Sequence, residues 1–280
     1  MPEQNQAENL QLDKSCTQEI IQTALTTENE DVYWDLVHIL RIRGGDEEFT
    51  AASHLCEGKN PQERTLGVNI LAQLGTTQGN FCTRERGEIL LKLLSYEEDE
   101  NVLAAIGYAF GHLQDARGIF PLIKFKNHAN CNVRMGVVFG LSCQEDESAI
   151  QALIELSGDV DNEVRNWATF GLGSQIAIDT PAIRDALYQR IISEVEDDKD
   201  DTVAEIRGEA LLGLAIRKDQ RVIEPLITEL ESGCVGRLSV EAALAIGDNR
   251  LYPSLMKLQD WWDVDVELLQ AAIAKCQTSN

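Results

Sequence analysis

The side chains best suited to catalysis or metal binding are few in this sequence and form no recognisable cluster. None of the four histidines is followed by a glutamate, and they are spread along the chain: His38, His54, His112 and His128. The seven cysteines are equally scattered and include no C-x-x-C pair. An odd number of scattered thiols is typical of reduced cysteines, most of them small core residues. We therefore predict no metal site and no cysteine nucleophile.

Motifs that bind phosphate, activate a serine or hold calcium are also missing. The chain has no G-x-x-x-x-G-K-[ST] loop, no G-x-S-x-G elbow and no D-x-D-x-D-G loop. The sequence therefore predicts no cofactor. It favours a non-catalytic protein, while an enzyme of unrecognised type stays open.

Five arginines mark the register of a repeat: Arg64, Arg134, Arg165, Arg207 and Arg237. The step from Arg64 to Arg134 is 70 residues and holds one further repeat, and extra helix and a loop widen the step from Arg165 to Arg207 to 42 residues. The step from Arg134 to Arg165 is 31 residues, and the step from Arg207 to Arg237 is 30. Aspartates precede the arginine, as Asp159 and Asp161 precede Arg165. We predict a structural ladder in which each arginine pairs with a loop aspartate of its own or the next repeat. Contact with a bound molecule is the alternative.

The elements that carry these arginines are predicted to be helices. Apolar residues recur three and four positions apart, as in Ile89, Leu90, Leu93 and Leu94, which indicates a helix with one buried stripe. No alternating β-branched run suggests a strand. We expect about eight units of two antiparallel helices, stacked as one domain over residues 15–280. Residues 1–14, rich in Gln, Asn and Glu, are expected to be a disordered tail.

Two segments carry a motif of a known family. Asp219, Arg221, Ile223, Pro225, Leu226 and Leu230 fit the pattern D-x-R-x-I-x-P-L-x-x-x-L, and Asp115 to Leu122 repeat its first half. The pattern resembles HEAT repeats, specifically the short HEAT-like repeats named after the phycobilisome (PBS) lyases, over residues 15–276. The resemblance implies an all-α fold, an α-α superhelix or HEAT-like solenoid, with the second helices lining a concave groove. It implies little about activity, and the His-Glu pairs of a diiron hydroxylase with this repeat are missing.

An apolar column follows the arginines on the second helices. Five positions after the arginine stand Phe139, Phe170 and Leu212, and Tyr108 stands five positions after Leu103, which takes the arginine position in its repeat. Trp34 and Met135 occupy the position one turn earlier on the same face. We predict that these six residues form a partner-binding stripe along the groove, because contiguous exposed apolar surface usually marks a binding site. The alternative is that the rings fill the core between repeats. Trp167 is expected to pack in the core.

Charge and hydropathy limit the class of partner. The chain has 47 acidic and 24 basic residues and a net charge of −23, which argues against binding a nucleic-acid backbone. The charge suits a basic partner, or serves only to keep a long surface soluble. No apolar run is long enough to span a membrane and no signal segment is recognised, so we expect a cytoplasmic protein without membrane contact.

These observations predict a non-catalytic, bacterial protein-interaction scaffold whose acidic-rimmed groove binds another protein, which we expect to be basic. The alternative comes from the resemblance alone. A relative of the PBS lyases would handle a bilin, an open-chain tetrapyrrole carried by a phycobiliprotein.

Overall fold

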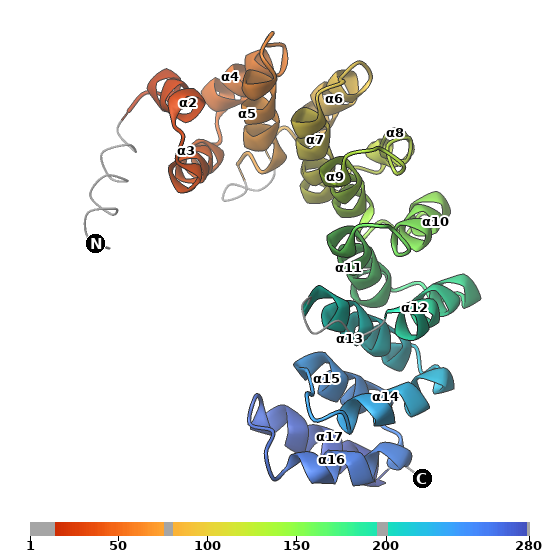
Figure 1. The fold of residues 1–280 in the computed structure, drawn as a ribbon. Coiled ribbons are helices and arrows are strands. Elements are labelled where there is room, and N and C mark those ends of the chain that lie inside the picture. The colour runs from red at the N-terminus through yellow and green to blue at the C-terminus, as the bar shows by residue number, and fades with distance from the viewer. Residues whose placement is uncertain (1–14, 76–80, 195–200, 279–280) are drawn as a thin grey trace. The chain divides into compact units, whose positions relative to one another are not determined.

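The computed structural model describes residues 15–75, 81–194 and 201–278, and these residues are helical throughout, without a strand. They form eight helical hairpins in two compact units, residues 1–141 and 142–280 (Figure 1). The all-α fold and the number of two-helix repeats agree with the sequence prediction. That the units continue as one solenoid stays a prediction, and the predicted tail, residues 1–14, lies outside the described residues.

Unit 1 contains four hairpins. Their helices are α2 (Thr17–Thr26) and α3 (Glu30–Arg43), α4 (Asp46–Cys56) and α5 (Pro61–Ala72), α6 (Thr83–Leu94) and α7 (Glu100–Leu113), and, after the 3-10 turn η2 (Ala116–Gly118), α8 (Ile119–Ile123) and α9 (Cys131–Leu141). The second helices α3, α5, α7 and α9 pack side by side, and the first helices form a separate row behind them. We call the side turned away from the first helices the second-helix face.

Unit 2 repeats this arrangement. Its helices are α10 (Glu147–Leu156) and α11 (Asn162–Phe170) with the π-helical turn η3 (Gly171–Gln175), α12 (Pro181–Ser193) and α13 (Asp201–Ile216), η4 (Gln220–Val222) with α14 (Ile223–Leu230) and α15 (Arg237–Ile246), and η5 (Asn249–Leu251) with α16 (Tyr252–Leu258) and α17 (Val266–Thr278). Here α11, α13, α15 and α17 form the second-helix row. Within the described ranges, no helix combines the length and apolar character needed to cross a membrane.

The D-x-R motif has a local structural cause. In η4 the Asp219 carboxylate accepts a hydrogen bond from the backbone N–H of Arg221 at 3.0 Å and also binds its guanidinium at 2.7 Å. Asp115 with Arg117 in η2 and Asp248 with Arg250 in η5 repeat both contacts. The aspartate satisfies an amide that would otherwise lack a partner at the start of the helix. The motif therefore fixes where each of these first helices begins.

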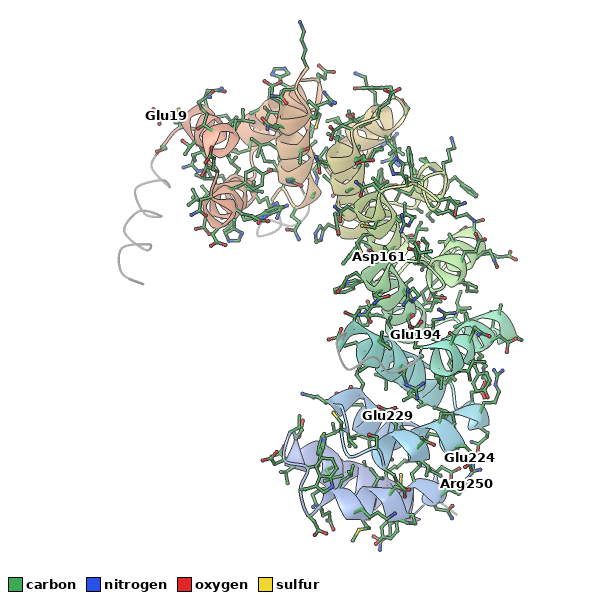
Figure 2. All side chains as sticks on the ribbon, viewed as in Figure 1. Glu19, Asp161, Glu194, Glu224, Glu229 and Arg250 are labelled. Atoms are coloured by element: carbon green, nitrogen blue, oxygen red, sulfur yellow. The ribbon has the colours of Figure 1, made fainter. Side chains whose placement is uncertain are left out.

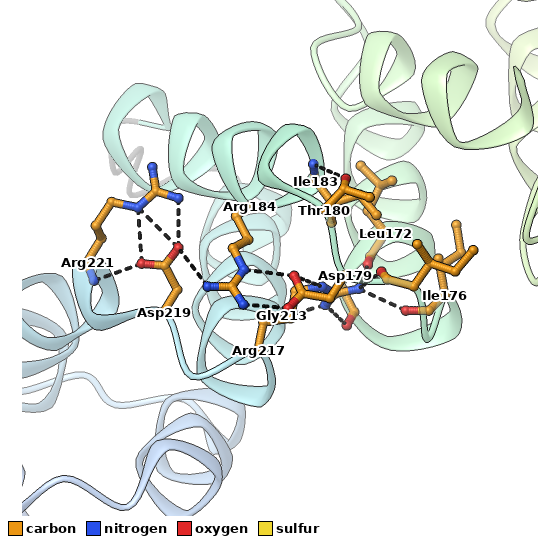
Figure 3. Close-up of polar contacts among 12 residues, drawn as sticks. Leu172, Ile176, Asp179, Thr180, Ile183, Arg184, Gly213, Arg217, Asp219 and Arg221 are labelled. Atoms are coloured by element: carbon orange, nitrogen blue, oxygen red, sulfur yellow. Dashed lines mark hydrogen bonds and ion pairs between the residues drawn. The ribbon is translucent and has the colours of Figure 1, made fainter. Parts of the chain in front are cut away.

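The longer segment between Arg165 and Arg207 is held in place by a buried arginine, Arg217 (Figure 3). Its guanidinium donates to five carbonyl oxygens, those of Leu172 (2.7 Å), Gly173 (2.8 Å), Ile176 (2.8 Å), Gly213 (3.1 Å) and Ile178 (3.4 Å). It thereby joins the π-helical turn after α11 to the end of α13. Asp179 lies 3.8 Å from the Arg217 Nε and pairs with Arg184. Burying this cation is tolerated because carbonyls and a carboxylate surround it.

Candidate functional site

Four of the six predicted stripe residues lie in unit 1, and none of them is fully buried. Trp34 on α3 is 43% exposed and Tyr108 on α7 is 36% exposed, while Met135 and Phe139 on α9 are half-buried. The rings of Tyr108 and Phe139 meet at 4.8 Å between centroids, tilted by 48°. Trp34 instead makes an edge contact with Tyr33 at 5.2 Å. The structure therefore brings together Tyr108 and Phe139.

Small residues allow the Tyr108–Phe139 contact. A Cβ atom on Gly107 would lie 2.6 Å from the Cα of Gly136, and one on Gly136 would lie 2.7 Å from the carbonyl oxygen of Ala104. Side chains larger than hydrogen at these two glycines would hold the backbones of α7 and α9 apart. The close approach of the two helices lets their adjacent aromatic residues touch.

In unit 2, Phe170 and Leu212 are half-buried, and the ring next to Phe170 is Trp167. The two rings meet edge-to-face, with centroids 5.7 Å apart and planes at 89°. The expectation that Trp167 packs in the core is wrong, because this side chain is 38% exposed. Val164 and Ala168 form the buried stripe of α11, and Trp167 lies at its edge. The structure thus pairs Tyr108 with Phe139 in unit 1 and Trp167 with Phe170 in unit 2, with Trp34 apart from both. A stripe continuous along the whole row stays a prediction.

Carboxylates of α13 bind the two side chains that flank Phe170 one helical turn before and after it. Asn166 on α11 donates to Glu205 on α13 at 2.9 Å, and Ser174 donates to Glu209 at 3.3 Å. Burial raises the pKa of Glu209; the hydrogen bond from Ser174 opposes this shift, and the charges of Glu241 and Glu205 add to it. We call Glu163, Glu205, Glu209 and Glu241 the acidic row. Sequence reasoning predicted acidic character for the rim but did not assign these residues.

Three of the five predicted ladder arginines bind a glutamate of the next repeat. The pairs are Arg64 with Glu97 at 2.6 Å, Arg165 with Glu194 at 3.0 Å and Arg207 with Glu229 at 3.4 Å (Figure 2 labels Glu194 and Glu229). Arg134 donates to the carbonyls of His128 and Ala129, and Arg237 binds Glu241 within its own helix and Asp265 at 3.5 Å.

The partners of Arg165 show why the expected aspartates are used differently. Arg165 donates to the backbone carbonyl of Asp159 at 2.8 Å. The carboxylate of Asp161 instead accepts from the backbone N–H of Val164 and caps α11. Aspartate is a favoured N-cap because its short side chain reaches the amides of the first turn. The glutamate side chain is longer than that of aspartate and reaches the arginine of the preceding repeat. That these contacts act as an alignment ladder stays a proposal.

No group of three or more His, Cys, Asp or Glu within the described part of the chain is placed to hold a metal ion. In unit 1 a cleft of about 390 Å³ lies between α3 and α5, with the end of α2 on one side, and Trp34 is the one predicted residue that lines it. Sequence reasoning did not find this cleft, because its walls come from three different repeats.

Comparison with known proteins places the chain among helical-repeat proteins. The sequence model of a family described as HEAT repeats matches residues 87–173. An X-ray structure of YibA from Escherichia coli superposes with a TM-score of 0.76 at 27% identity, covering 98% of this chain and 96% of that one. A chain in a structure of Kap95p with RanGDP shares the fold, with a TM-score of 0.66 at 15% identity, over 95% of this chain and 41% of that one.

The family assignment comes from the sequence of YibA. The two chains are 30% identical over 247 residues, which cover 86% of this chain and 84% of YibA. The comparisons single out HEAT repeats in general rather than the PBS-lyase subgroup, and they give the bilin alternative no support. This chain therefore belongs to the family of Escherichia coli YibA.

Proposed function

We propose that this protein is a non-catalytic scaffold that binds a basic segment of a partner protein on the second-helix face of unit 2. The fold is suited to this role because stacked hairpins present an extended, preformed surface. The Kap95p structure provides a precedent, since Kap95p binds RanGDP.

One observation carries the choice of a basic partner: the acidic row lies beside the exposed Trp167 and the half-buried Phe170. Residues 142–280 contain 27 acidic and 12 basic side chains, a net charge of −15, against −8 for residues 1–141. Exposed aromatic rings supply contact area at an interface, and surrounding charges steer the encounter. The raised pKa of Glu209 shows that its negative charge is poorly compensated in the free protein. A lysine or arginine of the partner would supply the missing charge.

The test begins with capture of partner proteins from the native host at physiological salt, followed by titration of a purified partner. The double variant Glu205→Gln/Glu209→Gln removes two charges from the acidic row. We expect it to weaken binding about tenfold, or about 1.4 kcal/mol, and to reduce the salt dependence of the affinity. The variant Trp167→Ala should weaken binding by a similar factor with its salt dependence retained.

A matched control removes the same charge elsewhere in unit 2. The variant Glu145→Gln/Glu147→Gln changes two exposed glutamates at the start of α10, in the first-helix row, and should leave the affinity unchanged. Failure to capture any protein would count against a scaffold. Equal loss of affinity in both double variants would show that net charge, and not this face, governs binding.

A further inference from the structure

The cleft of unit 1 differs in chemistry from the acidic row. It lies between α3 and α5 and reaches Asn101 on α7, and its walls include Tyr33 and Trp34. The remaining lining is made mainly of amides, hydroxyls and short apolar groups, including Gln62, Thr65 and Asn69, and Glu30 at one end is its one carboxylate. In a chain with a net charge of −23, this is a nearly neutral surface.

A polar network across three second helices holds an arginine beside this cleft. The Arg41 guanidinium lies over the Trp34 ring, 5.7 Å from its centroid, and Nε donates to the carbonyl of Asn69 at 2.8 Å. Nη1 donates to the side chain of Gln73 at 2.7 Å, and the Gln73 amide contacts the ring of His112 at 3.0 Å. The second amino group of Arg41 donates to no atom of the described residues.

Arg41 is unusual because no carboxylate of the described residues neutralises it. Most other arginines have a carboxylate within 4 Å, as Arg64, Arg165 and Arg221 do. Arg86 also lacks one, but it is fully buried and its guanidinium donates to the Leu71 carbonyl and the Thr83 hydroxyl. Burial without such a partner lowers the pKa of Arg41 to about 10. Burial, together with the charge of Arg41, also lowers the pKa of His112. An oxyanion bound to Arg41 would oppose both pKa shifts, because a nearby negative charge favours the protonated forms and charge-assisted hydrogen bonds are stronger than neutral ones.

We propose that this part of unit 1 is a second binding site for a partner polypeptide. Arg41 binds a carboxylate of the partner, and the partner's apolar side chain next to that carboxylate lies in the cleft against Trp34. One guanidinium matches a monoanion, and Glu30 at the other end of the cleft disfavours a dianion such as phosphate. The amides and hydroxyls of the lining can bond peptide groups. The site does not depend on the basic-partner proposal, since it lies in the other unit and selects the opposite charge.

The test compares short peptides that differ only at the terminal group. Acetylated tripeptides ending in Leu, Phe or Trp are titrated into the full chain as free acids and as amides, and the indole N–H signal of Trp34 is followed by NMR. We expect at least one free acid to shift this signal and to bind about tenfold more tightly than its amide, as the loss of one charge-assisted bond requires. Equal affinity of acid and amide, or an unchanged signal, overturns the proposal.

Variants separate charge from folding. The variant Arg41→Gln should abolish the preference for the acid, Arg41→Lys should retain part of it, and Arg84→Gln, on the first-helix row, should leave it intact. Thermal unfolding of each variant establishes that the chain is folded. A preference that survives in Arg41→Gln overturns the assignment of Arg41. Inorganic phosphate is titrated in the same way. If phosphate shifts the Trp34 signal only when Arg41 is present, and no peptide shifts it, the ligand is not a polypeptide and the proposal is overturned. Neither result affects the proposal for unit 2.

Discussion

At the scale of single residues, the second-helix faces contain charges that the fold leaves uncompensated. Glu209 in unit 2 and Arg41 in unit 1 are both partly buried, and the ordinary pKa of each is shifted toward its neutral form. A group held in this way costs folding free energy. Such costs are common where a surface is arranged for binding rather than for stability.

Replacement of Glu209 tests this view through pH. Its folded pKa is raised above the ordinary value of 4.5, so the native state holds the proton more tightly than the unfolded chain. The free energy of unfolding therefore falls as pH rises from 4.5 through the folded pKa, and the penalty is complete above it. We expect Glu209→Gln to unfold at a higher temperature than wild type at pH 7 and at nearly the same temperature at pH 4.

The control for this measurement is Glu224→Gln, which removes an exposed charge on α14. Its difference from wild type should vary little between pH 4 and pH 7. A Glu209→Gln protein that is less stable than wild type at pH 7 would show that the carboxylate stabilises the fold.

At the scale of helices, the contacts that build the faces are of two kinds. Glycine allows close approach of α7 and α9, and arginine–glutamate pairs join one repeat to the next. The first kind depends on shape and the second on charge. They can therefore be tested by different substitutions.

The variant Gly107→Ala tests the close approach. Its new Cβ would lie 2.6 Å from the Cα of Gly136, so the helices must separate. We expect a loss of about 1–3 kcal/mol in the free energy of unfolding measured with urea. Gly158→Ala is the control, since its Cβ would meet only the carbonyl of Glu155 at 3.5 Å. Similar stability of the two variants would mean that α7 and α9 can adjust without cost.

The variants Arg165→Ala and Glu194→Ala, with the double variant, test the ladder. The side chains are 14% and 6% exposed, so their attraction is less screened than at a fully exposed pair. We expect a coupling energy of about 1–3 kcal/mol from urea unfolding, and unchanged affinity of folded Arg165→Ala for the basic partner. If Arg165→Ala keeps its stability and loses partner binding, the arginine is a contact residue and the ladder interpretation is wrong.

At the scale of the whole molecule, stability is expected to spread from each repeat to its neighbours. Within a unit, each hairpin buries its apolar side against the next one, so a lesion in one hairpin removes support from its neighbour. Leu172 is fully buried, and its carbonyl also accepts from Arg217.

Hydrogen exchange of Leu172→Asp tests this spread. We expect protection to be lost in α11, α12 and α13 together, because an unpaired charge enters the core. Ala177→Asp introduces the same charge at an exposed position in the following connection and should leave protection unchanged. Loss confined to η3 would mean that the repeats open independently.

The sequence alone determined the repeat, the all-helical class and the start of several helices, because periodicity, N-caps and the Asp219–Arg221 turn act over a few neighbouring residues. It also identified Trp34, Tyr108 and Phe139 as residues of the second-helix faces. Only the tertiary structure showed that Trp167 is exposed, that Glu97 and Glu194 pair with ladder arginines, and that Arg41 lacks a carboxylate beside a cleft. These features depend on distances between helices about 30 residues apart, and a helical pattern specifies which face a side chain is on but not what the neighbouring helix places opposite it.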